Sequence, residues 1–140
     1  MKTWLFDTGP LIAYLDRSDP DHEPVAACLE SFTGRLVTTG AVITEAMHFL
    51  APAETGPDTL ASFVAASDLE IFDYAQPSEL RHAADLMAKH HDLPMDYADA
   101  TLVLLGARLG VAEILTLDRR GFGVFRLPRR KRFRLVLDER

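Results

Sequence analysis

The sequence is poor in cysteine and has no long uninterrupted apolar run. Its one cysteine, Cys28, excludes an intramolecular disulfide, and no Cys/His cluster has the spacing of a zinc site. The longest apolar region, 100–117, is interrupted by Arg108 and Glu113, which predicts a buried helix and strand and no membrane span. No secretory signal is visible, because Asp7 breaks the first apolar stretch. We therefore expect a protein of the reducing cytoplasm.

Basic residues are scarce in most of the chain and concentrated at its end. Residues 1–118 hold 6 Lys+Arg against 19 Asp+Glu, whereas residues 119–140 hold 9 against 2. An acidic body with a basic segment is consistent with a metal-binding acidic site beside a surface that attracts polyanions. A solvated basic face without any ligand explains the same distribution equally well.

Repeats, low-complexity segments and linkers are also absent, and 140 residues are enough for one domain with a substantial core. Short apolar segments alternate with segments of helical periodicity. We expect strands at Thr3–Phe6, Leu36–Thr39, Leu69–Phe72 and Ile114–Leu117, with weaker ones at Val124–Leu127 and Phe133–Leu137. We expect helices at Pro10–Asp16, Glu23–Phe32, Ala41–Leu50, Pro57–Ala66, Ser78–His91 and Asp96–Leu109. The alternation predicts a single α/β domain over 1–140, with a mostly parallel central sheet and helices on both faces.

Two acids follow predicted strands at the carboxyl edge of the expected sheet. Asp7 comes directly after Thr3–Phe6, and Asp118 comes directly after Ile114–Leu117 in "ILTLD". Binding sites of open parallel sheets form at this edge, so the two side chains are expected to meet there. Taken singly, each Asp is better explained as a helix N-cap or a turn residue.

Three further acids lie in predicted helices with apolar faces. Glu45 stands in the middle of "AVITEAMHFL", where a solvated helix surface is the alternative explanation. Asp96 and Asp99 begin the most apolar helix of the chain, and their i,i+3 spacing puts both on one face. Asp96 alone fits an N-cap, whereas an acid at position 99 is less expected there.

These acids would repel one another if they were gathered in a dry pocket, and a hard divalent cation removes that conflict. Mg²⁺ and Mn²⁺ prefer carboxylate and water oxygens. Such a cluster can activate water and stabilise a phosphate during hydrolysis. The convergence of the acids is an inference from topology, because their spacing alone does not require it.

Four segments, in order along nearly the whole chain, resemble the PIN-domain family, and specifically the VapC-type ribonuclease toxins of toxin–antitoxin pairs. The segments are "FDTGPLIAYLD", the helix containing Glu45 after "LVTTGAVITE", "DLPMDYADATLVLLGARLG" and "ILTLDRRGFGVFR". The family's small polar residue after Thr8 is replaced here by Gly9, so a hydroxyl that would contact phosphate or water is missing.

The resemblance implies a metal-dependent endoribonuclease with Mg²⁺, or alternatively Mn²⁺, as its cofactor. The four matching catalytic acids are Asp7, Glu45, Asp99 and Asp118. Asp7, Asp99 and Asp118 are expected to bind the metal, and Asp96 matches a frequent acid that assists or replaces Asp99. The resemblance also implies an RNA substrate, an antitoxin partner and a homodimer.

Several neighbours of the acids are candidates for substrate contact. Thr8 and Thr116 flank two acids and can hydrogen-bond a carboxylate or phosphate, although a backbone or core contact is the simpler role. Arg119 and Arg120 follow Asp118 and suit an RNA backbone contact; plain surface charge is the alternative. The segment "RRKRFR", 129–134, fits a single-strand RNA groove or an edge strand with alternating Arg.

Two other function classes compete with the nuclease hypothesis. A non-catalytic RNA- or antitoxin-binding module with a degenerate site is disfavoured because all four acids are present. A phosphotransfer enzyme with Asp7 as nucleophile would need a second Asp at the position of Gly9. A receiver domain is also disfavoured, because this sequence lacks the paired acids and the downstream lysine that such a domain needs.

Overall fold

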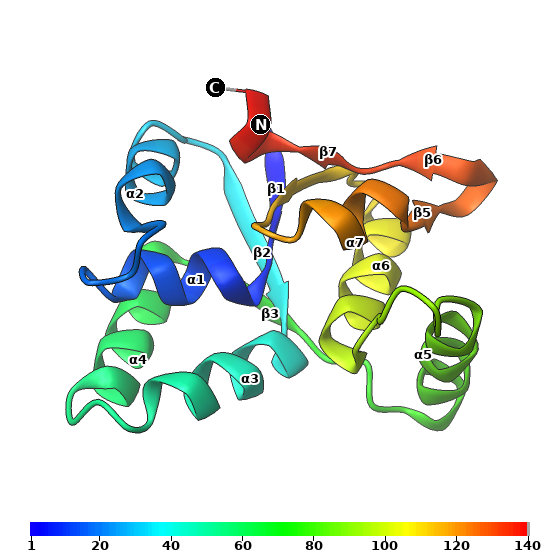
Figure 1. The fold of residues 1–140 in the computed structure, drawn as a ribbon, viewed down its shortest axis with the longest axis horizontal. Helices are drawn as coiled ribbons and strands as arrows, with labels where there is room; N and C mark the ends of the chain where they lie inside the picture. Colours follow the sequence, from blue (N-terminus) through cyan, green and yellow to red (C-terminus); the bar gives the residue numbers. More distant parts are fainter. Residues whose placement is uncertain (140) are drawn as a thin grey trace.

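Five short strands form a parallel sheet in the order β3-β2-β1-β4-β7 (Figure 1). The computed structural model describes residues 1–139, so Arg140, the last residue of the predicted domain and of the basic segment, lies outside the described residues. The strands are β1 (Thr3–Phe6), β2 (Arg35–Thr39), β3 (Glu70–Phe72), β4 (Glu113–Leu115) and β7 (Arg134–Leu135). The prediction of a mostly parallel α/β sheet is confirmed.

Seven α-helices within residues 1–139 surround this sheet, with α1–α4 on one side and α5–α7 on the other in Figure 1. They are α1 (Thr8–Leu15), α2 (His22–Glu30), α3 (Gly40–Leu50), α4 (Gly56–Ser67), α5 (Pro77–Lys89), α6 (Tyr97–Leu109) and α7 (Arg119–Val124). The first six match the predicted helices closely. In this part of the chain no helix has the length and apolar character needed to cross a membrane.

The end of the chain differs from the prediction. Helix α7 is not among the predicted helices. The strand expected over Val124–Leu127 is wrong in its first half, because Val124 is the last residue of α7. Strand β5 (Arg126–Leu127) pairs antiparallel with β6 (Lys131–Arg132) in a separate hairpin, outside the main sheet. The strand expected at Phe133–Leu137 is limited to β7, because Val136–Glu139 turn into a short 3₁₀ helix.

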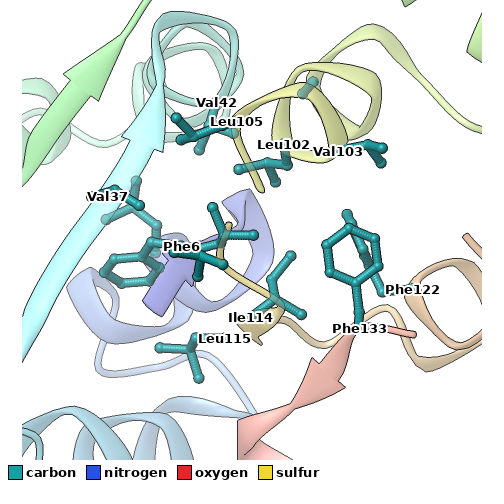
Figure 2. Close-up of a cluster of buried hydrophobic side chains, with 14 of the residues drawn as sticks. Phe6, Val37, Val42, Leu102, Val103, Leu105, Ile114, Leu115, Phe122 and Phe133 are labelled. Carbon is teal, nitrogen blue, oxygen red and sulfur yellow. The ribbon is translucent and has the colours of Figure 1, made fainter. Parts of the chain in front are cut away.

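The apolar core lies between the sheet and α6, as Figure 2 shows for Phe6, Leu102 and Ile114. Helix α6 is buried almost continuously from Ala98 to Gly106, because the sheet, α3 and α5 all pack against it. Gly110 ends the helix with a φ of 67°, a left-handed conformation that favours glycine, as its sequence position predicts. The core therefore fixes the start of α6, and with it the direction of Asp96 and Asp99.

The strand order creates a site at one edge of the sheet. From β1 the chain proceeds to β2 and β3 on one side, and it then returns to place β4 on the other side of β1. A crevice forms outside the carboxyl ends of strands at such a reversal. Asp7 leaves β1 at this point, and its backbone N–H still donates to the Leu115 carbonyl of β4 at 3.0 Å.

Candidate active site

A cavity of about 460 Å³ opens at the carboxyl ends of β1 and β4. We call it the acidic cavity, because all five acids singled out in the sequence line it. Its lining residues are Asp7, Thr8, Gly9, Glu45, Pro94, Asp96, Asp99, Leu117 and Asp118. The fold thus brings together residues from four separate segments of the chain.

Asp7 is the most constrained of these acids. It is 7% exposed and forms the N-cap of α1, where its Oδ1 accepts the Thr8 N–H at 2.8 Å. Its Oδ2 accepts the hydroxyl of Thr116 at 2.7 Å. The same Thr116 oxygen accepts the backbone N–H of Asp118 at 3.0 Å. One buried hydroxyl therefore holds the acids that follow β1 and β4, a role that the sequence left open for Thr116.

Asp118 reaches the acidic cavity by a different local structure from the one predicted. Strand β4 ends at Leu115, two residues early, and Asp118 is the N-cap of α7 instead of the residue directly after a strand. Its Oδ1 accepts the N–H of Gly121 at 2.9 Å. A Cβ at Gly121 would lie 2.2 Å from Asp118 Oδ2, so the cap requires glycine there. The "DRRG" segment encodes this cap.

Asp96 and Asp99 form a reciprocal capping box at the start of α6. Asp96 Oδ1 accepts the Asp99 N–H at 2.8 Å, and Asp99 Oδ2 accepts the Asp96 N–H at 3.1 Å. Each carboxylate therefore has one oxygen engaged by the backbone. Asp96 is exposed and Asp99 is half-buried. The N-cap role expected as the simpler explanation for Asp96 is confirmed, and it coexists with a position on the cavity wall.

Glu45 comes to the acidic cavity on α3, where it is half-buried, and the solvated surface position considered for it is wrong. The start of α3 is tied to α6 by buried hydroxyls. Thr101 Oγ1 donates its hydrogen to the Ala98 carbonyl at 2.7 Å. It therefore accepts a hydrogen bond from the hydroxyl of Thr39, the N-cap of α3, at 2.8 Å. This buried link fixes the position of α3, which carries Glu45, relative to α6, which carries Asp99. No sequence motif predicts it.

Burial and like charges raise the pKa values of the cavity acids. Burial raises the pKa of Asp7 to about 6, against bonds from Thr116 and Thr8 that lower it, with Asp96 and Asp118 adding repulsion. Burial, followed by repulsion from Asp96 and Asp7, raises the pKa of Asp99 to about 8. Burial raises the pKa of Glu45, against a hydrogen bond with Thr8 that lowers it, and the neighbouring Asp96 raises it further. Crowding therefore outweighs the helix N-termini, which favour the ionised forms.

The donor set fits a hard divalent cation. Within residues 1–139, no three Asp, Glu, His or Cys side chains are drawn close enough to hold a metal ion, so the carboxylates border the cavity without meeting at one point. The lining groups that can bind a cation are all oxygens. The buried Thr8 hydroxyl, which lies beside the Glu45 carboxylate, adds one more. Carboxylate and hydroxyl oxygens are the ligands that Mg²⁺ and Mn²⁺ prefer.

The two arginines after Asp118 have different positions. Arg119 lies outside the acidic cavity, where its Nε donates to Asp138 Oδ1 at 2.7 Å. Arg120 lines a smaller neighbouring space, which we call the connecting cavity, together with Asp92, Leu93, Pro94, Asp118 and Gly121. Arg120 therefore keeps the position expected of a phosphate contact, whereas Arg119 is engaged in an ion pair.

Comparison with curated proteins identifies a relative of the chain. This chain is 32% identical to Ribonuclease VapC26 of Mycobacterium tuberculosis over 124 residues. The aligned region covers 87% of this chain and 91% of that protein. No family model matches the chain.

Solved structures with a similar fold include one toxin and two toxin–antitoxin complexes. VapC20 of M. tuberculosis, described as a sarcin–ricin loop cleaving toxin, superposes with a TM-score of 0.71 at 15% identity, covering 83% of this chain and 90% of that chain. The DNA-bound VapBC complex of Salmonella typhimurium gives 0.65 at 20% identity, covering 97% and 99%. The DNA-bound VapBC2 complex of Rickettsia felis gives 0.63 at 12% identity, covering 95% and 98%. At these identities the likeness establishes the fold.

The raised pKa values predict an unusual pH dependence of stability in metal-free protein. The folded state keeps protons on Asp99 and Asp7 to about pH 8 and about pH 6, whereas an unfolded chain releases them near 3.8. These groups therefore destabilise the fold as pH rises from about 4 to about 8. In EDTA, Asp99→Asn should raise Tm at pH 8 and flatten its fall from pH 5 to pH 8. The control Asp85→Asn, at an exposed site, should leave the dependence of Tm on pH unchanged. If Asp99→Asn also had the same Tm profile as the unaltered protein, the raised pKa of Asp99 would be contradicted.

Loss of the shared hydroxyl should disturb two acids at once. Thr116→Val keeps the shape but removes the donor to Asp7 and the acceptor for the Asp118 N–H. Losing a group that orients metal ligands typically weakens metal affinity about 10–100-fold. We expect a loss of that size in Mn²⁺ titrations by calorimetry. Thr44→Val, which removes an exposed hydroxyl bond within α3, should bind Mn²⁺ like the unaltered protein. Equal affinities for all three proteins would refute the role of Thr116.

Proposed function

The chain belongs to the VapC family of PIN-domain ribonuclease toxins, and on that premise we propose that it hydrolyses RNA phosphodiester bonds at the acidic cavity, with Mg²⁺ or Mn²⁺. The convergence of five acids on this cavity carries the proposal. The sequence relative, named a ribonuclease, matches 87% of the chain. The proposal extends that activity to the residues of this protein.

The metal would be held by Asp7, Asp99 and Asp118, with Asp96 as an assisting acid. A bound divalent cation supplies charge neutralisation at the phosphate and activation of water. Asp7 suits this role because the Thr8 N–H and the Thr116 hydroxyl fix the direction of its carboxylate. The Gly121 N–H orients the carboxylate of Asp118 in the same way.

The remaining residues would handle the substrate and the water. Glu45 lies beside Asp96 in the acidic cavity, and we assign its carboxylate to orienting the attacking water and holding its proton. The Thr8 hydroxyl, which lies beside the Glu45 carboxylate in this cavity, would donate to a phosphate oxygen of the bound substrate. Arg120, in the connecting cavity, supplies a guanidinium that can pair with the next phosphate. Its side chain makes no ion pair among the described residues.

The partners follow from the same family. Two solved relatives are VapBC complexes, which supports an antitoxin as the protein partner of this chain. A homodimer and a cytoplasmic location remain parts of the proposal; the single buried Cys28 agrees with a reducing compartment. A non-catalytic RNA-binding module is the alternative, and the complete set of acids argues against it.

Removal of one carboxylate charge at the cavity should abolish cleavage. Asp7→Asn and Asp99→Asn each keep the side-chain shape but remove a charged metal ligand. A bound metal ion stabilises the charge of the transition state by several kcal/mol. We expect kcat/KM for a mixed RNA to fall by at least about 100-fold, and EDTA to stop cleavage until Mg²⁺ is restored. Asp85→Asn, on the exposed face of α5, should cleave normally. Cleavage by a folded Asp7→Asn or Asp99→Asn protein at the normal rate would reject the assignment.

A further inference from the structure

A groove lies away from the five acids, between α5, α6, the end of α7 and the β5–β6 hairpin. Its volume is about 730 Å³. Leu86, Val103 and Leu104 form an apolar floor, whereas Lys89, Arg129 and Arg130 stand at the exposed rim. No described residue that lines it is acidic. We call this space the basic groove.

The cations at the rim are available to a ligand. Lys89, Arg129 and Arg130 make no ion pair within residues 1–139, unlike Arg119 and Arg134, which pair with acids. A fourth cation, Arg126, caps α7: its guanidinium donates to the carbonyls of residues 123, 124 and 125, and so it stays beside the groove. A groove with only positive charges at its rim is complementary to a polyanion.

The turn of the hairpin carries its two arginines at a backbone cost. Arg129 and Arg130 have φ values of 62° and 61°, and the Lys131 N–H donates to the Pro128 carbonyl. These are the features of a type I′ turn, in which Asn-Gly is the favoured pair because the left-handed region strains other residues. Arginine at these two positions therefore lowers the stability of the turn but places two cations at the groove rim.

Two segments of the chain lead from the basic groove past the connecting cavity to the acidic cavity. Lys89 and His90 line the groove, residues 92–94 line the connecting cavity, and Pro94 and Asp96 line the acidic cavity. Helix α7 runs the same way, from Asp118 at the acids to Val124 at the groove. Its six residues span about 9 Å, the rise of about three stacked nucleotides. In Figure 1 the hairpin lies beyond α7 on the side of α5.

We propose that the basic groove binds the phosphates of the RNA strand a few nucleotides away from the bond that is cut. This inference rests on the proposed function, since it extends the path of that substrate from the acidic cavity past Arg120. The succession of the three spaces favours an RNA strand over an acidic peptide, because a strand cut at the acids must continue along the surface. No aromatic side chain other than histidine lines the groove, and Phe133 of "RRKRFR" is buried against Phe122. The contacts are therefore to phosphates and independent of base sequence.

The turn offers a variant that separates binding from folding. Arg129→Asn with Arg130→Gly installs the pair that the backbone prefers, so Tm should rise or stay unchanged while RNA binding weakens. Binding is measured by anisotropy with a labelled 20-nucleotide RNA in EDTA, over a series of salt concentrations. Loss of two phosphate contacts should reduce the slope of log K against log salt by roughly 1.4. The control, Lys2→Gln with Arg17→Asn, changes the net charge equally at exposed positions outside the three spaces and should keep the original slope.

The groove assignment fails if the turn variant keeps the original slope, or if the control loses as much as the turn variant. It also fails if a poly-glutamate peptide loses affinity for the turn variant while RNA does not, which would assign the groove to an acidic protein segment. Cleavage in Mg²⁺ by the unaltered protein is measured in parallel. If cleavage occurs and the slope is unchanged, only the groove is rejected; if the slope falls but no RNA is cut, the groove stands and the nuclease proposal is rejected.

Discussion

Mutual repulsion between carboxylates is the constraint on which this structure depends. Five acids border one cavity of about 460 Å³, and two of them hold protons well above the usual pH range of an aspartate. A fold selected only for stability would replace such groups, because each partly buried acid either stays protonated or destabilises its neighbours. Their retention is explained by a ligand with opposite charge. The proposed metal site and the proposed chemistry both follow from that requirement.

The fold tolerates the crowding by giving each acid near the strands a second, structural task. Asp7, Asp96 and Asp118 are the N-caps of α1, α6 and α7, so three helices begin at the same cavity. Thr116 joins two of these caps, and Gly121 leaves room for one. The capping explanation considered for single acids and the metal-site hypothesis are therefore compatible. The same hydrogen bonds that begin the helices orient the carboxylates.

Alternation of strands and helices predicts the sheet and six helices, because apolar periodicity over long segments reflects burial directly. The convergence of Asp7 with Asp118 is also expected from topology, since both leave parallel strands at one edge. Short elements are less predictable: α7 depends on one cap and one glycine, and a six-residue helix has little periodicity. Contacts such as Thr39 with Thr101 join residues 62 positions apart, so no local pattern encodes them. The hairpin arginines lie in a turn whose sequence lacks the usual Asn-Gly signal.

Anomalous diffraction from a crystal soaked in Mn²⁺ tests the central claim most directly. A cation that relieves the repulsion must lie among the carboxylates, so we expect a manganese peak in the acidic cavity. Oxygens of Asp7 and Asp99 should lie about 2.1 Å from it, and the peak should vanish in crystals of Asp7→Asn protein. An ordered cavity without a peak, or a peak held only by acids elsewhere on the surface, would contradict the account.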